Sequence, residues 1–460
     1  MINFLRFLAL LLLVGIVAFL AFVFLPVRTT EPVSALADDW QPEAGAGEYA
    51  MYASDCLACH TAEDGEDFAG GLPVESPMGT IWSTNITPDP ETGIGGYTLD
   101  QFRAVLYDGI RADGVHLYPA MPYENYRNLT EEDVRGLYDY FMNEVEPVRN
   151  EVPETKLSFP FNLRFGIRAW NWAALRHDPG FTPAGVSEAQ DRGQYLVEGP
   201  GHCAACHSPR TALMTQDGIA AGDDNFLTGS VINGWDAPAL RGEGSVSQRW
   251  SVQQMAQYLA TGRNDHATAN GEMGLVIEDS LQHLTDEDNI AIAAFLKGLD
   301  GGEVELPERL MPEGVQAIPA PEADDAGQET AQMLASASPD MPLGARLYLD
   351  NCSGCHFVSG KGAPGMFPAL AGNDLVTGSQ PGPLVSIILD GASVPGTDLR
   401  PMELRMQGYA DRLSDEEVAE LASFLRSAWG NEAAAVSADT VASYRDEGPD
   451  RDDASAAAGE

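Results

Sequence analysis

Positively charged residues are scarce in this chain. Its 460 residues include 26 Lys and Arg against 69 Asp and Glu, which gives a formal net charge of −43. Nucleic acids and anionic lipid surfaces are poor partners for such a field, because like charges repel. The acidic residues are spread along the chain and form no single block, which favours a role in solubility over the steering of a basic partner.

Cysteine is also scarce, and none is left over for a disulfide framework. All 6 cysteines lie in three copies of Cys-x-x-Cys-His, at residues 56–60, 203–207 and 352–356. In each copy, one helical turn can present two thiols to the two vinyl groups of a haem while the adjacent imidazole coordinates the iron. A zinc site would need a second cysteine or histidine pair at short range, and a redox dithiol would not need a histidine after it three times.

The three motifs therefore predict three covalently bound haem c groups. We expect two thioether bonds and one axial imidazole at each haem. The residues are Cys56, Cys59, Cys203, Cys206, Cys352 and Cys355 for the covalent bonds, and His60, His207 and His356 for the iron.

The N-terminus carries one long apolar segment. Residues 7–26 contain no charge and are almost entirely aliphatic or Phe, and twenty residues span roughly 30 Å as a helix. This length exceeds the signal-peptide core of about 7–15 residues and favours an uncleaved membrane anchor, although the small residues at 35–37 could serve as a cleavage site. In either case the chain after Arg28 is directed out of the cytoplasm, where haem c is normally attached.

A capped amphipathic helix is predicted downstream of each motif. The three helices begin after Thr130, Thr285 and Ser414, which suit N-cap positions, and the acids that follow suit the positive end of the helix dipole. Ser414 and Glu417 can form a capping box. Apolar residues recur with helical spacing after the first and third caps, at Val134, Leu137, Tyr138 and Phe141 and at Val418, Leu421 and Leu425.

This layout predicts an all-α fold, because few runs alternate β-branched with polar residues. We expect three tandem class I cytochrome c-like domains after an N-terminal hydrophobic helix. Residues 303–339 are rich in Pro, Ala, Glu and Gln and predict an extended tether, and residues 432–460 are rich in Ala, Asp, Glu and Ser. The expected division is 1–30 membrane anchor or signal segment, 40–150 first domain, 151–186 inter-domain linker, 187–302 second domain, 303–339 linker, 340–431 third domain and 432–460 disordered acidic tail.

The inter-domain linker has an unusual composition. Between residues 159 and 176 it gathers five aromatic side chains together with three arginines. Apolar and basic residues in an acidic protein could form a docking surface. Packing between adjacent domains is the simpler explanation, and the sequence favours it.

The sixth iron ligand is expected to be methionine, because a thioether opposite histidine stabilises ferrous iron and raises the reduction potential. Such a ligand should come from the loop before the terminal helix. Met121, Met273 and Met406 lie eight, eleven and seven residues before the leucine that opens each capped-helix motif.

Other side chains compete for these positions. Met78 is the rival in the first domain, but it lies much nearer the haem motif. In the second domain His266 and His283 remain alternatives, although a lone histidine is more often a surface or core residue than a ligand. In the third domain Met402 follows Pro401 at a less fitting distance than Met406.

Several longer stretches are more specific than the haem motifs. The first domain contains residues 79–89 (GTIWSTNITPD), 92–95 (TGIG) and 116–123 (HLYPAMPY), the second contains 192–203 (RGQYLVEGPGHC) and 208–210 (SPR), and the third contains 344–348 (GARLY), 367–373 (FPALAGN) and 429–431 (WGN). They resemble the triheme cytochrome c subunits of bacterial membrane-bound alcohol, aldehyde and gluconate-type dehydrogenases. The resemblance covers roughly residues 44 to 431.

The resemblance implies a function and a location. Such subunits accept electrons from a periplasmic catalytic partner and deliver them to ubiquinone in the membrane or to another respiratory carrier. The chain is then expected on the periplasmic side of the bacterial inner membrane, anchored or peripherally attached. The histidines and methionines chosen above fall on the axial-ligand positions of that family, although Gln407 follows Met406 where the family commonly has Pro. Pro364 or Pro368 is expected to offer a backbone carbonyl to His356.

An electron-transfer subunit without a substrate site is therefore the leading hypothesis. The sequence has no Gly-rich nucleotide-binding turn, no nucleophile elbow and no likeness to a pyrroloquinoline quinone enzyme, so substrate oxidation is expected on a partner chain. That partner could be a flavin, molybdenum or quinone enzyme, which leaves the substrate open. One alternative is a peroxidase-like haem enzyme with an open coordination site, and another is a stand-alone respiratory cytochrome.

Overall fold

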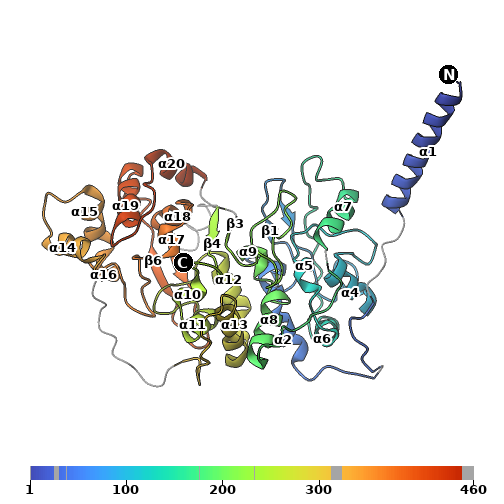
Figure 1. Ribbon diagram of the computed structural model, residues 1–460, viewed down its shortest axis with the longest axis horizontal. Helices are drawn as coiled ribbons and strands as arrows, with labels where there is room; N and C mark the ends of the chain where they lie inside the picture. Colours follow the sequence, from blue (N-terminus) through green and yellow to red (C-terminus); the bar gives the residue numbers. More distant parts are fainter. Residues whose placement is uncertain are drawn as a thin grey trace. The chain divides into compact units, whose positions relative to one another are not determined.

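The N-terminal apolar segment forms one long helix, α1 (Ile2–Phe24). Residues Asn3–Val23 are long and apolar enough to cross a membrane, and none of that window is buried by the rest of the protein (Figure 1). The computed structural model describes residues 2–24, 31–37, 39–175, 177–232, 234–311 and 324–447. Residues 25–30 of the expected anchor segment, the middle of the expected tether at 312–323 and the end of the expected tail at 448–460 lie outside these ranges.

The chain divides into two compact units. Unit 1 comprises Met1–Thr182, Glu198–Ala205 and Arg210–Ile219, and unit 2 comprises Pro183–Val197, Cys206–Pro209 and Ala220–Glu460. Unit 2 contains most of the helical residues of both the second and the third expected domains. One reason is the ion pair between Arg249 and Asp374, which joins the two expected domains inside this unit.

Unit 1 is built from short helices. After α1 its elements are α2 (Ala46–Ala53), α3 (Cys56–His60), β1 (Pro73–Val74), β2 (Ile81–Trp82), α4 (Leu99–Asp108), α5 (Tyr123–Tyr126), α6 (Glu131–Asn143) and α7 (Phe165–Ala174). Helices α8 (Glu188–Glu198) and α9 (Ala204–His207) each have residues in both units.

Unit 2 is also mainly helical. Its elements are β3 (Ser230–Ile232), β4 (Trp235–Ala237), α10 (Val246–Arg249), α11 (Val252–Thr261), α12 (Glu272–Asp279), the 3-10 helix η1 (Leu281–His283), α13 (Asp286–Gly298), α14 (Gln328–Ser336), α15 (Leu343–Asn351), α16 (Ser353–His356), α17 (Asp374–Thr377), α18 (Gly382–Asp390), β5 (Gly391–Val394), β6 (Leu404–Gln407), α19 (Asp415–Ser427) and α20 (Ala438–Glu447). The strands of the described residues form three antiparallel pairs, β1 with β2, β3 with β4 and β5 with β6.

All three predicted helix caps are confirmed. Thr130 accepts a hydrogen bond from the amide of Asp133 at 3.1 Å at the start of α6, and Thr285 accepts one from the amide of Asp288 at 3.2 Å at the start of α13. At the start of α19, Ser414 forms both hydrogen bonds of the predicted capping box. The predicted apolar stripes are buried as well, with Tyr138 only half-buried and the others in the hydrophobic cores.

Each capped helix contacts a helix that precedes a haem motif, and a glycine makes the contact close. A Cβ atom on Gly47 of α2 would collide with the carbonyl oxygen of Gly136 in α6. The same holds for Gly193 of α8 against α13 and for Gly344 of α15 against α19. The same helix pair therefore occurs three times along the chain.

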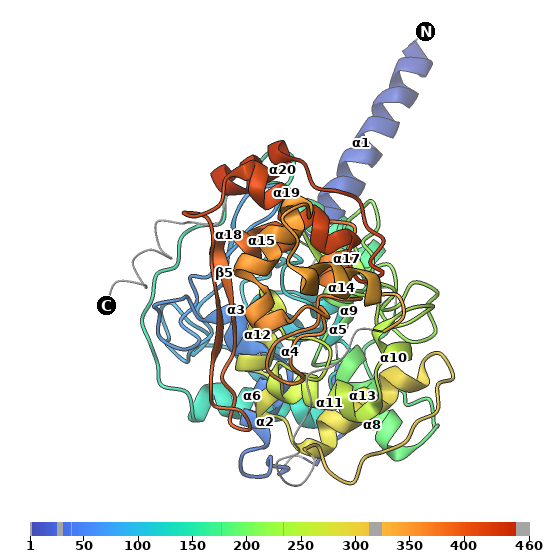
Figure 2. The ribbon, with the colours of Figure 1, turned by 90° about the vertical axis from the view of Figure 1, so that its left-hand side faces the viewer.

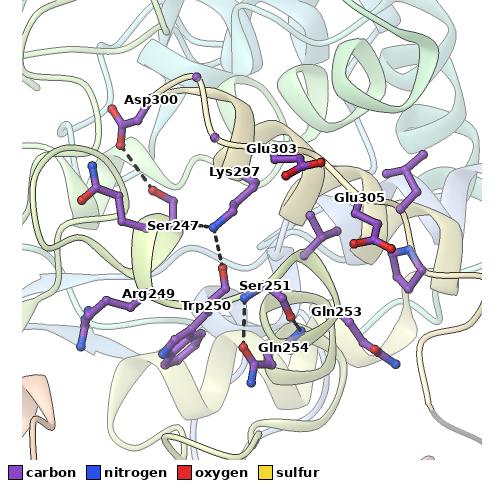
Figure 3. A pocket seen from close by; sticks show the side chains of 16 residues that line it. Ser247, Arg249, Trp250, Ser251, Gln253, Gln254, Lys297, Asp300, Glu303 and Glu305 are labelled. Atoms are coloured by element: carbon purple, nitrogen blue, oxygen red, sulfur yellow. Dashed lines mark hydrogen bonds between the residues drawn. The ribbon is translucent and has the colours of Figure 1, made fainter.

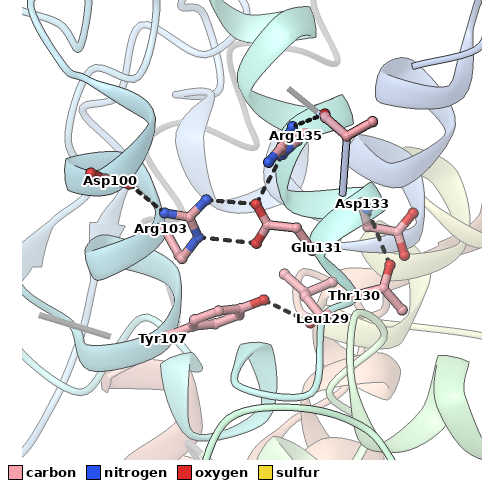
Figure 4. A network of polar contacts seen from close by, with 9 residues as sticks. Asp100, Arg103, Tyr107, Leu129, Thr130, Glu131, Asp133 and Arg135 are labelled. Carbon is pink, nitrogen blue, oxygen red and sulfur yellow. Dashed lines mark hydrogen bonds and ion pairs between the residues drawn. The ribbon is translucent and has the colours of Figure 1, made fainter. Parts of the chain in front are cut away.

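A buried ion pair ties the start of α6 to α4 (Figure 4). Arg103 donates from Nε and Nη2 to the two carboxylate oxygens of Glu131 at 3.0 and 2.6 Å, and both side chains are buried. Arg135 reaches the same carboxylate at 3.0 Å, and Tyr107 donates to the carbonyl of Leu129 at 2.8 Å. The first residue of α6 is thus held from two sides.

Two helices lie where the composition predicts extended or disordered chain. Helix α14 lies within the expected tether at 303–339, and Leu334 in it is buried in the core of unit 2. Helix α20 lies within the expected tail, where Val441 is fully buried and α20 packs beside α19 (Figure 2). The expectation of disorder from residue 432 is therefore wrong for 438–447, because a few apolar residues in a polar segment suffice to dock a helix.

Candidate haem sites

Each Cys-x-x-Cys-His motif forms a short helical turn, as predicted. The turns are α3, α9 and α16, and each of them ends at the motif histidine. None of the six cysteines forms a disulfide, and the first of each pair is half-buried while the second is exposed. Each motif therefore has two thiols and an adjacent imidazole, which is the donor set that a covalent haem c requires.

A backbone carbonyl holds each motif histidine at the same ring nitrogen. The distance from Nδ1 to the carbonyl oxygen is 2.6 Å for His60 and Thr84, 2.8 Å for His207 and Pro238, and 2.9 Å for His356 and Pro368. A carbonyl oxygen can only accept, so Nδ1 must carry the proton. The lone pair of Nε2 is then available for a metal ion, and the ring orientation is fixed.

The electrostatic setting of these histidines also suits metal binding. Burial lowers the pKa of His60, His207 and His356 below the usual value, and the hydrogen bond to the carbonyl only partly offsets this effect. A neutral imidazole is the form that binds a metal ion. The lowered pKa therefore favours the neutral form of the three rings near neutral pH.

The thiols of Cys56 and Cys352 are poor candidates for a thiolate site. Burial raises the pKa of the Cys56 thiol, with smaller contributions from Asp55 and Cys59, and burial raises the pKa of Cys352 to about 12. Redox and zinc-binding cysteines need a low pKa, because the thiolate is the reactive form. Within the described residues, no group of three or more His, Cys, Asp and Glu is arranged to hold a metal ion.

The first site brings its predicted methionine to the core around the motif. Met121 and Cys56 are both partly buried and pack against the same hydrophobic cluster of unit 1. The loop around Met121 is firmly held, since Tyr123, two residues later, is fully buried and donates to Asn171 Oδ1 at 2.8 Å. The rival Met78 lies in a different loop, where its carbonyl accepts from the amide of Ser158.

The third site has the same arrangement. Met406 in β6 is half-buried and packs against the core cluster that Cys352 also contacts. Met402 is 68% exposed and Met366 is 49% exposed, so neither has the buried setting of an axial ligand. Their exposure favours Met406, although the residue lies in a strand and not in an irregular loop.

The second site differs from expectation in one detail. Met273 lies in the first turn of α12, and not in a loop, and its side chain is half-buried. The alternative His266 stacks on Trp250 with ring centroids 5.7 Å apart, and His283 lies in the 3-10 helix η1. Another methionine of this region, Met255, is buried within α11. The pairing of Met273 with His207 stays a prediction.

Known proteins resemble the chain over most of its length. The family model Cytochrome c matches residues 342–429. The cytochrome c subunit of the quinone alcohol dehydrogenase of Gluconacetobacter polyoxogenes is 40% identical over 408 residues, which cover 87% of this chain and 84% of that protein. The chain belongs to the family of dehydrogenase cytochrome c subunits.

Other members of this family are equally similar. The gluconate 2-dehydrogenase cytochrome c subunit of Pantoea cypripedii is 39% identical over 91% of this chain and 93% of its own length. The fructose dehydrogenase cytochrome subunit of Gluconobacter japonicus is 38% identical over 91% of this chain and 85% of its own length. This dehydrogenase cytochrome subunit therefore carries covalent haem c and transfers electrons, while the catalytic activity belongs to another subunit.

Sequence reasoning missed two of the three carbonyls that hold the histidines of this cytochrome subunit. Pro368 was one of two residues expected to serve His356, but Thr84 and Pro238 were not expected. Every residue has a backbone carbonyl, so residue type alone cannot identify the one that contacts a histidine. Only the neighbouring sequence could have indicated these two positions. Thr84 lies inside the family-like stretch 79–89, and Pro238, like Pro368, is a proline downstream of its motif.

A polar pocket elsewhere in unit 2 contains none of the predicted ligands. It has a volume of about 770 Å³ and is lined by residues that include Ser247, Trp250 and Lys297 (Figure 3). The Lys297 ammonium donates to the carbonyls of Ser247 and Trp250 at 2.7 and 3.0 Å. This lysine holds the backbone around α10 and is not a free reactive group.

Proposed function

We propose that this cytochrome subunit binds three haem c groups, one at each Cys-x-x-Cys-His motif, in three tandem cytochrome c-like domains. Its main support is the threefold recurrence of one arrangement. In each copy a carbonyl holds the motif histidine at Nδ1, and a glycine of an earlier helix contacts the capped helix downstream. When bound, haem c supplies reversible one-electron chemistry.

The chain's own residues hold and tune each haem. The thioether bonds are formed by the cysteine pair of each motif, which is Cys56 and Cys59, Cys203 and Cys206, or Cys352 and Cys355. Each iron is coordinated by one histidine and one methionine, which are His60 with Met121, His207 with Met273, and His356 with Met406. Methionine opposite histidine favours the ferrous state and closes the iron to small ligands, which suits transfer of electrons and not catalysis.

The electrons enter from a dehydrogenase catalytic subunit and leave to ubiquinone or another respiratory carrier. The names of the relatives point to partners that oxidise an alcohol, a sugar or a sugar acid. The resemblance of the sequence adds an aldehyde as a candidate substrate class. Helix α1 is long and apolar enough to serve as a membrane anchor, which supports the proposal. The rest of the chain then lies on the periplasmic side of the inner membrane, where haem c is attached. The haems would then lie close to the membrane surface, where a membrane-bound carrier can accept their electrons.

Substrate-dependent haem reduction tests this function. Membranes that contain the chain are incubated without oxygen with ethanol, gluconate or fructose, and the absorbance of ferrous haem c is recorded. We expect at least one substrate to reduce the haem, and a catalytic chain to copurify after detergent extraction. Membranes from a strain that lacks the chain are the control. A haem-loaded chain that stays oxidised with every substrate and purifies alone would contradict the proposal.

A further inference from the structure

An exposed group of large apolar side chains lies just before and within α7. We call Phe159, Phe161, Leu163, Phe165 and Trp172 the aromatic patch. All five are exposed, and Phe159 and Trp172 keep 76% and 74% of their surface in contact with solvent. The sequence favoured packing between adjacent domains for this segment, but that packing would bury these side chains. A patch of this kind on a protein surface usually marks an interaction site.

The aromatic patch contacts the C-terminal part of α1 directly. The rings of Phe19 and Phe165 meet edge to face with centroids 5.6 Å apart, and those of Phe22 and Trp172 meet at 4.9 Å. The Arg168 guanidinium lies over the Phe22 ring at 5.2 Å. Figure 1 shows α7 beside the end of α1 from which the chain continues. If α1 spans the membrane, this end lies at the membrane surface, and α7 lies at the same depth.

The charge of the segment fits a membrane surface as well. No Asp or Glu occurs from Thr155 to His177, although the whole chain has 69 of them. The segment contains Lys156, Arg164, Arg168 and Arg176. Residues 155–177 therefore lack the negative charge with which the rest of the protein would repel anionic lipid headgroups. Exposed Trp and Phe with nearby Arg are typical of residues at the headgroup level of a bilayer.

The opposite face of α7 is hydrogen-bonded to other segments of unit 1. Asn171 donates to the carbonyl of Asp108 at 3.2 Å and accepts from the Tyr123 hydroxyl. Trp170 donates from Nε1 to the carbonyl of Leu213 at 2.7 Å. Leu213 and the adjacent Met214 are themselves exposed. One face of α7 thus packs against the rest of unit 1, and the face that carries Phe165 and Trp172 points away from it.

We infer that the aromatic patch, extended by Leu213 and Met214, lies in the headgroup region of the lipid bilayer as a second membrane contact beside α1. Amphipathic surface elements enter this region to a depth of about 5–10 Å. The contact orients unit 1 against the membrane, which a single membrane-spanning helix would not do. The inference rests on the proposed membrane anchor but not on the number or ligation of the haems.

Quenching by lipid-borne nitroxides tests the inference. Where haem occupies all three motifs, one introduced cysteine is the only reactive thiol of the full chain, and bimane treatment of the unsubstituted chain measures any labelling of the native cysteines. Phe161→Cys and Trp172→Cys variants are labelled with bimane and reconstituted in phosphatidylcholine nanodiscs, with or without spin-labelled headgroups. Glu132→Cys is the matched control, on the exposed face of α6. The ratio of the two fluorescence intensities for one variant cancels quenching by haem.

We expect the spin-labelled lipid to lower bimane fluorescence at least about twofold at positions 161 and 172 and to leave position 132 unchanged, because only the patch enters the headgroups. An unquenched signal at both patch positions would overturn the inference. Quenching that is absent until a catalytic subunit is removed would identify the patch as a protein docking surface and would also overturn it.

Two controls separate this outcome from other failures. An unchanged low-spin haem spectrum in each variant shows that the protein is folded. The intact mass shows whether α1 is still present. If α1 has been removed, the proposed anchor is wrong, and the processed chain is mixed with phosphatidylcholine vesicles and sedimented. Cosedimentation that is lost in a Phe161→Ser/Trp172→Ser variant then supports the patch, and no cosedimentation overturns it.

Discussion

A backbone carbonyl decides which ring nitrogen of each motif histidine is available to the proposed haem iron. The partners of His60, His207 and His356 come from different loops, yet all three bind Nδ1. The contact leaves Nε2 as the only nitrogen with a free lone pair. At the scale of single residues, every motif histidine has the same hydrogen bond to a backbone carbonyl. The local structure around the proposed methionine ligand differs from site to site.

The first methionine assignment can be tested by substitution. We expect Met121→Ala to abolish the methionine-to-iron absorption band at one haem and to lower its reduction potential on the order of 0.1 V, because a thioether favours ferrous iron. Met78→Ala is the matched control and should leave both unchanged. The measurement is a potentiometric titration followed by absorbance. An unchanged spectrum and potential in Met121→Ala would show that another residue binds this iron.

The third assignment allows a sharper comparison. Met406 is half-buried, whereas Met402, four residues earlier, is exposed. We expect Met406→Ala to open one haem to carbon monoxide, because the iron loses its sixth ligand, and Met402→Ala to bind none. Carbon monoxide difference spectra of the reduced proteins measure this. If the two variants behave in the opposite way, the third haem uses Met402.

At the scale of elements, the start of α6 combines a helix cap with a buried ion pair. Thr130 caps the helix, and Glu131 directly after it binds Arg103 of α4. The cap is a local feature that the sequence shows through spacing. The ion pair joins residues far apart in the chain, so no local pattern predicts it.

Removal of the buried partner should destabilise unit 1. We expect Glu131→Ala to lower the free energy of unfolding by about 3–5 kcal/mol, since Arg103 is left buried without its main counter-charge. The exposed pair of Glu91 and Arg149 provides the control, and Glu91→Ala should cost about 1 kcal/mol or less. Denaturant unfolding followed by circular dichroism measures both. Equal losses of stability would mean that burial of the first pair has no energetic consequence.

Over the whole molecule, the sequence predicted repeated elements better than tertiary contacts. The motif turns, the three caps and the buried stripes were predictable because each depends on residues within one or two helical turns. Helix α20 was missed because its stability comes from burial of Val441 against other helices and not from its composition. The carbonyls of Thr84 and Pro238 were missed because the fold alone brings them to their histidines.

The exposed aromatic patch shows the same limit. Its composition was visible in the sequence, but exposure decides between internal packing and an external surface, and exposure is a property of the folded chain. The contacts of Phe165 and Trp172 with α1 then connect the patch to the candidate membrane span.

The central claim is that each motif carries one haem, and the ratio of haem c to protein tests it most directly. Pyridine haemochrome absorbance against protein concentration should give three haems for the full chain. It should give two in each variant that replaces both cysteines of one motif by alanine, at Cys56 and Cys59, at Cys203 and Cys206, or at Cys352 and Cys355. A full chain with fewer than three haems, or a motif variant that retains all of them, would contradict the account.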